Sequence, residues 1–148
     1  MNTSHDTSVL NTLIATTLDS VKGYQEAAEN SEDAMHRQFF AEMSQERSHV
    51  AADLQQQVRA SGGDPEMHGS TAGAVHRGWA DLKAAITGHN EKAIVNEVER
   101  GEDYIKAKFE AAVTDDELSA PARGVVEQCI GSIRKGHDRA SAMKHAMS

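Results

Sequence analysis

Apolar side chains between residues 31 and 60 recur every three or four positions, which is the spacing of a helix with one buried face. At about 100° per residue, one side of that helix collects Met35, Phe39, Phe40, Met43, Val50, Leu54 and Val58. The opposite side carries Arg37, Ser48 and Gln55. The pattern therefore predicts a long core-facing helix over residues 31–60.

The same period recurs in four other stretches and predicts helices over 8–29, 71–87, 91–113 and 119–146. Two successive start signals, at 114–117 and 119–121, leave the first residue of the last helix open. Residues 1–7 are polar, and we expect them to be flexible. The remaining stretch, 8–148, has the length of a single domain.

The breaks between these helices predict how they are connected. The break at Asn30 and Ser31 is so short that the helices on either side must form an antiparallel hairpin. The break at 61–65 combines glycine with proline and ends the second helix. A helix over 71–87 would be about 25 Å long at 1.5 Å per residue, enough to return the chain along most of a bundle. We therefore predict an all-α four-helix bundle with a long helical crossover between its second and third main helices. A five-helix up-and-down bundle is the alternative.

Glycines inside the predicted helices indicate places of close approach. Each costs about 0.5–1 kcal/mol relative to alanine, so we expect some of them to make room for a neighbouring backbone or ring. Trp79 and Tyr104 are the rings predicted there. The glycines concerned are Gly23, Gly73, Gly78, Gly101, Gly124, Gly131 and Gly136.

The composition of the 148 residues agrees with helices. Hydrophobic residues make up 39% of the chain but aromatic residues only 4%, which favours a helical core of aliphatic side chains. Only two prolines, Pro65 and Pro121, interrupt the helical pattern. The single cysteine, Cys129, has no partner for an internal disulfide, and its apolar neighbours predict a small buried side chain in place of a reactive thiol.

Charge narrows the classes of partner. The formal net charge is −8, from 23 acidic against 15 basic residues, with no local cluster of Lys or Arg. Repulsion from phosphates makes nucleic acid an unsuitable partner, so we predict none. No run of 18 apolar residues and no secretory signal is present, so we expect a cytoplasmic protein without a membrane partner.

Four short phrases carry a resemblance to a known family. They are 62–65 (Gly-Gly-Asp-Pro), 76–79 (His-Arg-Gly-Trp), 99–103 (Glu-Arg-Gly-Glu-Asp) and 137–139 (His-Asp-Arg). They resemble a bacterial family of small four-helix-bundle proteins that is placed in the ferritin-like superfamily and is described as a domain of unknown function. The resemblance implies a ferritin-like fold and a bacterial, intracellular setting, but no activity.

Glu46 and His49 suggest a metal site within that fold. A Glu and a His three residues apart present a carboxylate and an imidazole on one surface of a helix, and ferritin-like bundles bind metal with this spacing. Glu102, near the apolar face of 91–113, and His137, on the last helix, complete a set of four candidate ligands. Two imidazoles and two carboxylates could hold one iron, manganese or zinc ion.

Three observations favour a structural role for the same side chains. Eight histidines and 13 glutamates in 148 residues produce about one such pair by chance. A dinuclear site would need an inward acid on 8–29, where Asp19 and Glu26 lie nearly opposite the apolar face, and a Glu at position 134, where this chain has Arg. An interior carboxylate needs a partner, and Arg47 or Arg100 could supply it without a metal.

Two functions therefore follow from the sequence. The first is a non-catalytic structural or stress-associated interaction protein with a degenerate metal site, in which a second copy or another protein is the partner. It accords with the absence of a Gly-rich phosphate loop, a Cys-x-x-Cys pair or a nucleophile elbow. The alternative is a metal-binding or redox protein that holds iron, manganese or zinc between its second, third and last main helices.

Overall fold

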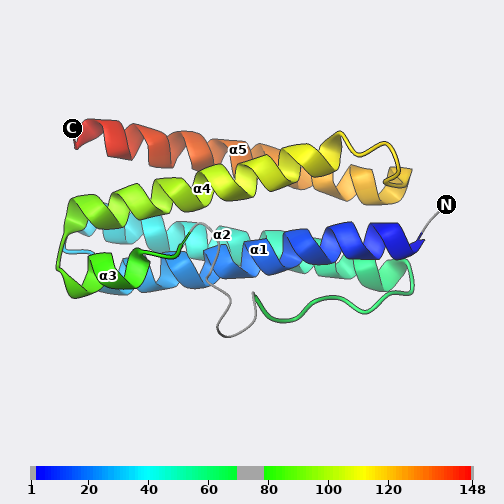
Figure 1. The fold of residues 1–148 in the computed structure, drawn as a ribbon, viewed down its shortest axis with the longest axis horizontal. Helices are drawn as coiled ribbons and strands as arrows, with labels where there is room; N and C mark the ends of the chain where they lie inside the picture. Colours follow the sequence, from blue (N-terminus) through cyan, green and yellow to red (C-terminus); the bar gives the residue numbers. More distant parts are fainter. Residues whose placement is uncertain (1–2, 70–78, 148) are drawn as a thin grey trace.

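The computed structural model describes residues 3–69 and 79–147, and these form five helices and no strand. The all-α prediction is confirmed for this part of the chain. Four long helices lie side by side (Figure 1), and a short α3 (Leu82–Thr87) lies at one end of them. The long helices are α1 (Thr3–Asn30), α2 (Ala34–Ala60), α4 (Glu91–Val113) and α5 (Ala120–Ala146).

The long helices are arranged as two hairpins that pack on each other. α1 and α2 are antiparallel and closely packed, and so are α4 and α5 (Figure 1). α1 also contacts α4, and α2 contacts α5, which joins the hairpins into one bundle. α2 and α4 run in the same direction, so the chain must travel back along the bundle between them (Figure 1).

The structure describes only the last part of the predicted helical crossover over 71–87. Residues 71–78 of that range lie outside the described residues; of the described residues 79–87, 79–81 are non-helical and 82–87 form α3. After α2 the chain runs without regular structure over 63–67, back along α1 (Figure 1). α4 still begins at the end of the molecule where α2 begins, as the predicted topology requires (Figure 1).

Side-chain amides explain why the first part of the return needs no helix. Asn11 donates to the carbonyl of Asp64 at 3.0 Å and accepts from the N–H of Glu66 at 2.8 Å. Gln55 donates to the carbonyl of Glu66 at 2.9 Å. These bonds satisfy backbone groups that a helix would otherwise pair internally, and they hold this segment against α1 and α2.

Capping side chains determine where the helices begin. α2 begins after Asp33, whose carboxylate accepts from the N–H groups of Met35 and His36, and not after Ser31. α5 begins after Ser119, which belongs to the second of the two start signals. α1 begins at Thr3, so the described part of the segment expected to be flexible is helical.

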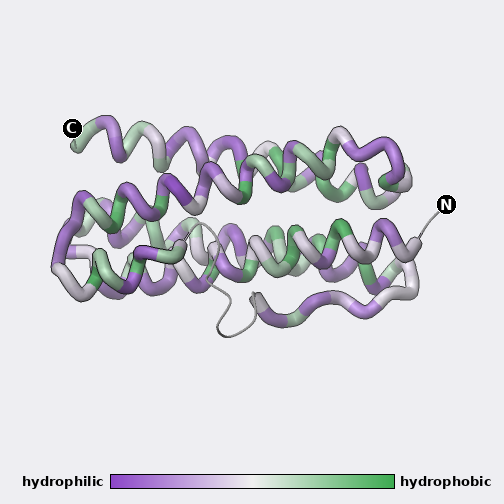
Figure 2. The backbone as a smooth tube through the Cα atoms, viewed as in Figure 1, coloured by the Kyte–Doolittle hydropathy of each residue, from purple (hydrophilic) through white to green (hydrophobic). Residues whose placement is uncertain are grey.

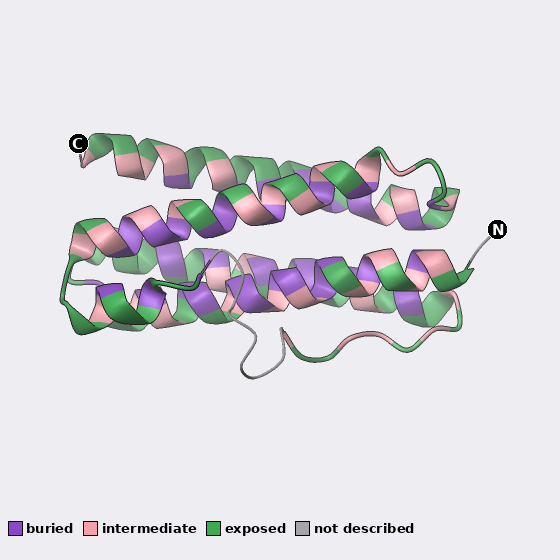
Figure 3. Ribbon diagram, viewed as in Figure 1, coloured by how far each residue is buried: buried purple, intermediate pink, exposed green. Residues whose placement is uncertain are grey.

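Two apolar clusters form the core, one in each half of the bundle. Hydrophobic and hydrophilic residues alternate along every long helix (Figure 2), and the buried ones lie where helices face each other (Figure 3). The aliphatic cluster contains Leu10, Leu13, Ile14, Val50, Leu54, Val58, Ile105, Phe109, Ala112, Leu118, Ala122, Val126, Cys129, Ile130 and Ile133. The aromatic cluster contains Tyr24, Ala27, Phe39, Phe40, Met43, Trp79, Leu82, Ala85, Ile94, Val95, Val98 and Ala140.

The Cys129 thiol lies inside the aliphatic cluster, as predicted, and is 4% exposed. Burial raises the pKa of this thiol to about 11, with a smaller contribution from the charge of Asp53. It is therefore protonated at neutral pH and packs as a small apolar side chain.

The prediction that Met35 belongs to the core is wrong, because its side chain is 80% exposed. Met35 precedes Glu42 and Glu46 by seven and eleven residues, so it falls on the polar edge of the helix with them and not on the line of Phe40 and Met43. It also lies in the first turn of α2. The apolar face of α2 therefore begins at Phe39.

The sequence places Asp19 nearly opposite the apolar face of α1, and its side chain is nevertheless only 4% exposed. It does lie away from the bundle axis, but the crossover covers it. A methyl group added to Gly69 would lie 2.3 Å from Oδ1 of Asp19, so the chain after α2 passes directly over this carboxylate. The outer face of α1 is therefore partly interior.

Trp79 occupies the kind of position that the glycines predict. A methyl group at Gly23 would lie 2.5 Å from Cδ2 of its indole, and one at Gly101 would lie 2.4 Å from Cε2. The ring is therefore held between α1 and α4 at two points where only glycine leaves enough room. Tyr104 takes no such position: it is half-buried, with the Lys108 ammonium 5.3 Å from its ring centre.

Carboxylates tie the two hairpins together at both ends. At one end Asp6 accepts from the N–H and hydroxyl of Ser119, at 2.9 and 2.5 Å. At the other, Glu91 at the start of α4 accepts from Ser31 and lies 2.5 Å from His36. Burial disfavours ionisation of Glu91, but these hydrogen bonds outweigh it and lower the pKa of the carboxyl.

His5 and Asp115 add a second tie at the first end. Nε2 of His5 lies 2.7 Å from Oδ2 of Asp115, joining α1 to the loop between α4 and α5. The hydrogen bond to Asp115 raises the pKa of His5 above its ordinary value of 6.5, and it lowers the pKa of Asp115 in return.

Glycine-to-alanine substitutions test how closely the helices approach the Trp79 indole. Gly101→Ala should lower the free energy of unfolding by about 1–2 kcal/mol, because overpacking against the indole exceeds the gain in helix propensity. Gly131→Ala is the matched control: its methyl group would meet nothing within 4 Å, so it should stabilise by about 0.5–1 kcal/mol. Chemical unfolding followed through Trp79 fluorescence measures both. Equal stabilisation by the two substitutions would contradict the close approach.

The His5–Asp115 tie predicts a pH dependence of stability. Because the pKa of His5 is raised in the folded state, its contribution is fully present below 6.5 and is lost as the pH rises through the folded pKa. The urea midpoint of the native protein should therefore fall more between about pH 6 and 8 than that of His5→Gln. Identical pH profiles for the two proteins would contradict the tie.

Candidate functional site

A buried ion pair occupies the middle of the bundle, between the two apolar clusters. Arg47 of α2 and Glu102 of α4 are both 0% exposed. Nη1 of Arg47 donates to Oε2 of Glu102 at 2.7 Å, and Nη2 donates to Oε1 at 2.6 Å. The guanidinium and the carboxylate thus form the two-pronged arrangement that gives the strongest pairing of these groups.

Residues of the other two long helices enclose the pair. From α1, the Ser20 hydroxyl lies 3.4 Å from Nη1 of Arg47, and the Tyr24 ring centre lies 5.7 Å from the guanidinium carbon. From α5, a methyl group on Gly136 would lie 2.7 Å from Nη2 of Arg47 and 3.0 Å from Oε1 of Glu102. All four long helices therefore meet at this ion pair.

The surroundings of Arg47 and Tyr24 keep each of them in one protonation state around neutral pH. Burial is the largest effect and opposes the charged form of Arg47, but the charges of Glu102 and Tyr24 and the hydrogen bonds to Glu102 together outweigh it and raise the pKa of the guanidinium. Burial, and then the charge of Glu102, also raises the pKa of Tyr24 well above its ordinary value. Around neutral pH, Arg47 is therefore charged and Tyr24 protonated, and neither is available as a base.

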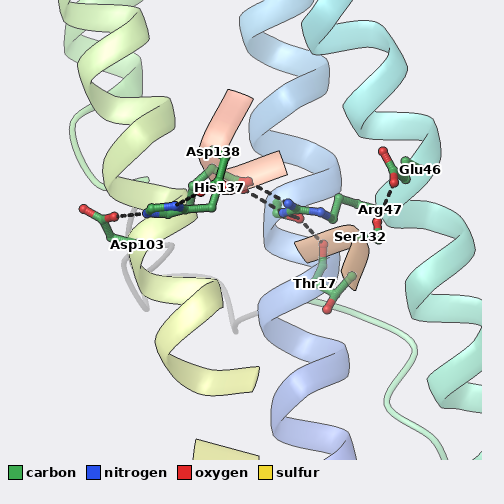
Figure 4. Close-up of polar contacts among 9 residues, drawn as sticks. Thr17, Glu46, Arg47, Asp103, Ser132, His137 and Asp138 are labelled. Carbon is green, nitrogen blue, oxygen red and sulfur yellow. Dashed lines mark hydrogen bonds and ion pairs between the residues drawn. The ribbon is translucent and has the colours of Figure 1, made fainter. Parts of the chain in front are cut away.

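Of the four residues predicted as metal ligands, Glu102 is the only one in this centre, and both its oxygens are bonded to Arg47. Glu46 precedes Arg47 on α2, but its side chain turns toward α5, where Oε1 accepts a hydrogen bond from the Ser132 hydroxyl at 2.5 Å (Figure 4). His49, one turn later, is exposed.

His137, the fourth predicted ligand, lies at the edge of the contact between α4 and α5. Its Nε2 lies 2.6 Å from Oδ1 of Asp103 and its Nδ1 lies 3.4 Å from Oδ1 of Asp138 (Figure 4). Its side chain is 18% exposed. His137 therefore has Asp103 and Asp138 as its polar partners, near the surface.

The four predicted ligands do not form one donor set in this arrangement. Within 3–69 and 79–147, no three His, Cys, Asp or Glu side chains are grouped so that they could hold a metal ion. Glu102 would have to leave Arg47, and His137 would have to leave Asp103, before either could bind one. A metal ion shared by Glu46, His49, Glu102 and His137 stays a prediction.

The phrase at 99–103 links α4 to three other parts of the structure: α5, residues 79–81 before α3, and α2. Glu99 pairs with Lys144 of α5 at 3.0 Å, and Arg100 pairs with Asp81 before α3 at 3.0 Å. Gly101 receives the indole of Trp79. Glu102 and Asp103 pair with Arg47 and His137, respectively. These contacts give each residue of the most recognisable phrase in the sequence a structural role.

The pattern of α2 contains a signal for Arg47 that the sequence reasoning did not use. Phe40, Met43, Arg47, Val50 and Leu54 follow one another at spacings of three, four, three and four, so Arg47 lies in the middle of the apolar face. A cation in that position must have a buried anion as partner. Glu102 holds the equivalent position on α4, between Val98 and Ile105.

The fold and the buried Arg47–Glu102 pair define the class of protein: a helical bundle with an ion pair between its helices in the core. The sequence matches a family described as a domain of unknown function, DUF2383, over residues 6–115, and the chain belongs to this family. The matched range includes both partners of the buried pair and ends before α5. No curated protein matched the sequence. No helix in the described part of the chain is long and apolar enough to cross a membrane.

A double-mutant cycle tests the buried pair. Arg47→Met and Glu102→Leu should each lower the free energy of unfolding by about 3–5 kcal/mol, because each leaves an uncompensated buried charge. The double variant should recover most of that loss, because neither charge remains. Chemical unfolding of all four proteins measures the coupling.

The exposed pair of Arg100 with Asp81 serves as the control, since its side chains are 54% and 72% exposed. Asp81→Asn should lower the free energy of unfolding by less than about 1 kcal/mol. Additive losses in the Arg47/Glu102 cycle would contradict direct coupling between the buried charges.

Proposed function

We propose that this protein is a non-catalytic helical bundle of the ferritin-like type that acts by binding another protein through its surface. The observation that carries the proposal is the Arg47–Glu102 pair. A ferritin-like metalloprotein places carboxylates and histidines of facing helices in the bundle core to hold its ions. Here a cation of the protein itself neutralises the core carboxylate.

The course of the chain supports the ferritin-like part of the proposal. α2 and α4 run in the same direction, and a long connection joins them (Figure 1). One long crossover between two helical hairpins is the arrangement of ferritin-like folds. On the resemblance of the sequence phrases, we extend the proposal to a bacterial, cytoplasmic protein.

The state of the interior groups supports a non-catalytic role. A general base or a nucleophile needs a pKa near the working pH. The interior thiol of Cys129 and the phenol of Tyr24 both have raised pKa values and are protonated at neutral pH. The guanidinium of Arg47 and the carboxylate of Glu102 bind each other. Chemistry by these groups would require the core to open.

One observation favours the alternative, a metal-binding or redox protein. Glu46 and His49 line the same surface hollow of α2, together with Glu42. A transition ion such as iron, manganese or zinc could use one carboxylate and the imidazole there. Glu102 and His137 would then have to exchange their present partners to complete the set.

Elemental analysis of untagged protein, purified without chelator, separates the two functions. We expect less than about a tenth of an equivalent of iron, manganese or zinc, and no rise in thermal stability on adding Fe(II) or Zn(II), because a bound ion would stabilise the folded state. A stoichiometric metal that is lost from Glu46→Gln, but kept by the exposed control Glu29→Gln, would overturn the proposed function.

A further inference from the structure

An apolar groove of about 720 Å³ lies between the first turns of α2 and the last turns of α5. Phe39 lines it and belongs to the buried aromatic cluster, whereas Met35 is almost fully exposed. Met143 and Met147 line it from the α5 side and are half-buried. The groove therefore exposes an apolar surface that continues into the core.

Acidic residues on α2 accompany this apolar surface. Asp33 and Glu42 line the groove. Asp33 caps α2 and accepts hydrogen bonds from backbone N–H groups. These bonds, chiefly the one from His36, lower the pKa of its carboxyl, so Asp33 is ionised at neutral pH. The one cation in the lining, Arg139, already has partners: its guanidinium lies 4.6 Å from the Phe39 ring centre and 3.6 Å from Glu42.

We propose that this α2–α5 groove binds a basic amphipathic helix of another protein. Two helices with apolar residues along the space between them form a seat for a third helix, which inserts its own apolar face. Methionine suits such a seat, because its unbranched side chain adapts to the shape of the occupant. The inference rests on the proposed function and names the chemistry of the partner.

Charge and size select this partner over a second copy of the chain. A second copy has the same net charge of −8 and would bring Asp33 and Glu42 to the same interface, so the two faces would repel each other. The α2 wall from Met35 to Glu42 is about 10 Å long at 1.5 Å per residue. That is too short for the roughly 800 Å² per partner that a stable dimer buries.

The dimensions of the groove also define the occupant. A wall of about two helical turns holds two or three apolar anchors at positions i, i+3 or i+4, and i+7. Lysine or arginine beside those anchors would face Asp33 at one end and Glu42 at the other. The carboxylates favour association with a cationic helix, and the apolar contact retains it.

Binding of a synthetic peptide tests the proposal. The probe is a fluorescein-labelled helix of about 14 residues, or four turns, with leucines at the anchor positions and lysines elsewhere. A matched peptide has glutamate in place of lysine. Fluorescence anisotropy is measured at physiological salt with the whole protein and with three variants, Met35→Gln, Met67→Gln and Glu42→Gln. Met35→Gln changes the groove, and Met67→Gln is the control, because Met67 is also exposed, at 54%, but lies on the crossover.

The expected result is one lysine peptide bound per chain, with affinity reduced about tenfold by Met35→Gln, a loss of about 1.4 kcal/mol. Met67→Gln should bind as the native protein does, Glu42→Gln should bind more weakly, and the glutamate peptide should not bind. Equal affinity of Met35→Gln and Met67→Gln, no binding of the lysine peptide, or equal binding of the glutamate peptide would overturn the proposal. A native dimer that Met35→Gln dissociates would overturn it too, in favour of a second copy.

Failure of this proposal can be told apart from failure of the proposed function. A metal-free protein that does not bind the lysine peptide refutes only the basic helix as partner of the groove. A stoichiometric metal on Glu46 refutes the proposed function, whatever the peptide does.

Discussion

The structure depends on one interaction, the ion pair of Arg47 with Glu102 in the middle of the bundle. Removing two charges from water costs several kcal/mol for each, and only close, two-pronged pairing offsets it. Arg47 is on α2, in one hairpin, and Glu102 is on α4, in the other. The two groups can therefore pair in this way at only one position of the hairpins relative to each other. Gly136 leaves space for both groups. The apolar clusters on either side supply most of the burial, and the ion pair sets how the hairpins fit together.

The same interaction determines what the protein can do. A carboxylate at the crossing point of four helices is the feature from which a metal centre could be built, but here the guanidinium takes both of its oxygens. The thiol of Cys129 and the phenol of Tyr24 have raised pKa values and are protonated at neutral pH. The proposed function therefore rests on the outer surface, where the groove of Met35, Phe39 and Met143 exposes apolar side chains.

The sequence predicted the all-α class, the return of the chain and the close seat of Trp79, because periodicity, breaks and helical glycines are local signals. It did not predict that Asn11 and Gln55 hold the backbone of the return, because these contacts join residues that are far apart in sequence. It placed Met35 in the core, although its spacing puts Met35 on the polar edge of α2 with Glu42 and Glu46, where it is exposed. It named Arg47 as a possible partner of an interior carboxylate, and the structure pairs Arg47 with Glu102. It did not decide among metal, arginine and water as the partner, because that choice depends on distances between helices.

A crystal structure grown with Fe(II) or Zn(II) and recorded at the metal absorption edge would test the central claim most directly. The account predicts that Arg47 and Glu102 keep both of their hydrogen bonds, with no anomalous peak between α2 and α4. An anomalous peak bound by Glu102, with the Arg47 guanidinium turned away, would contradict it.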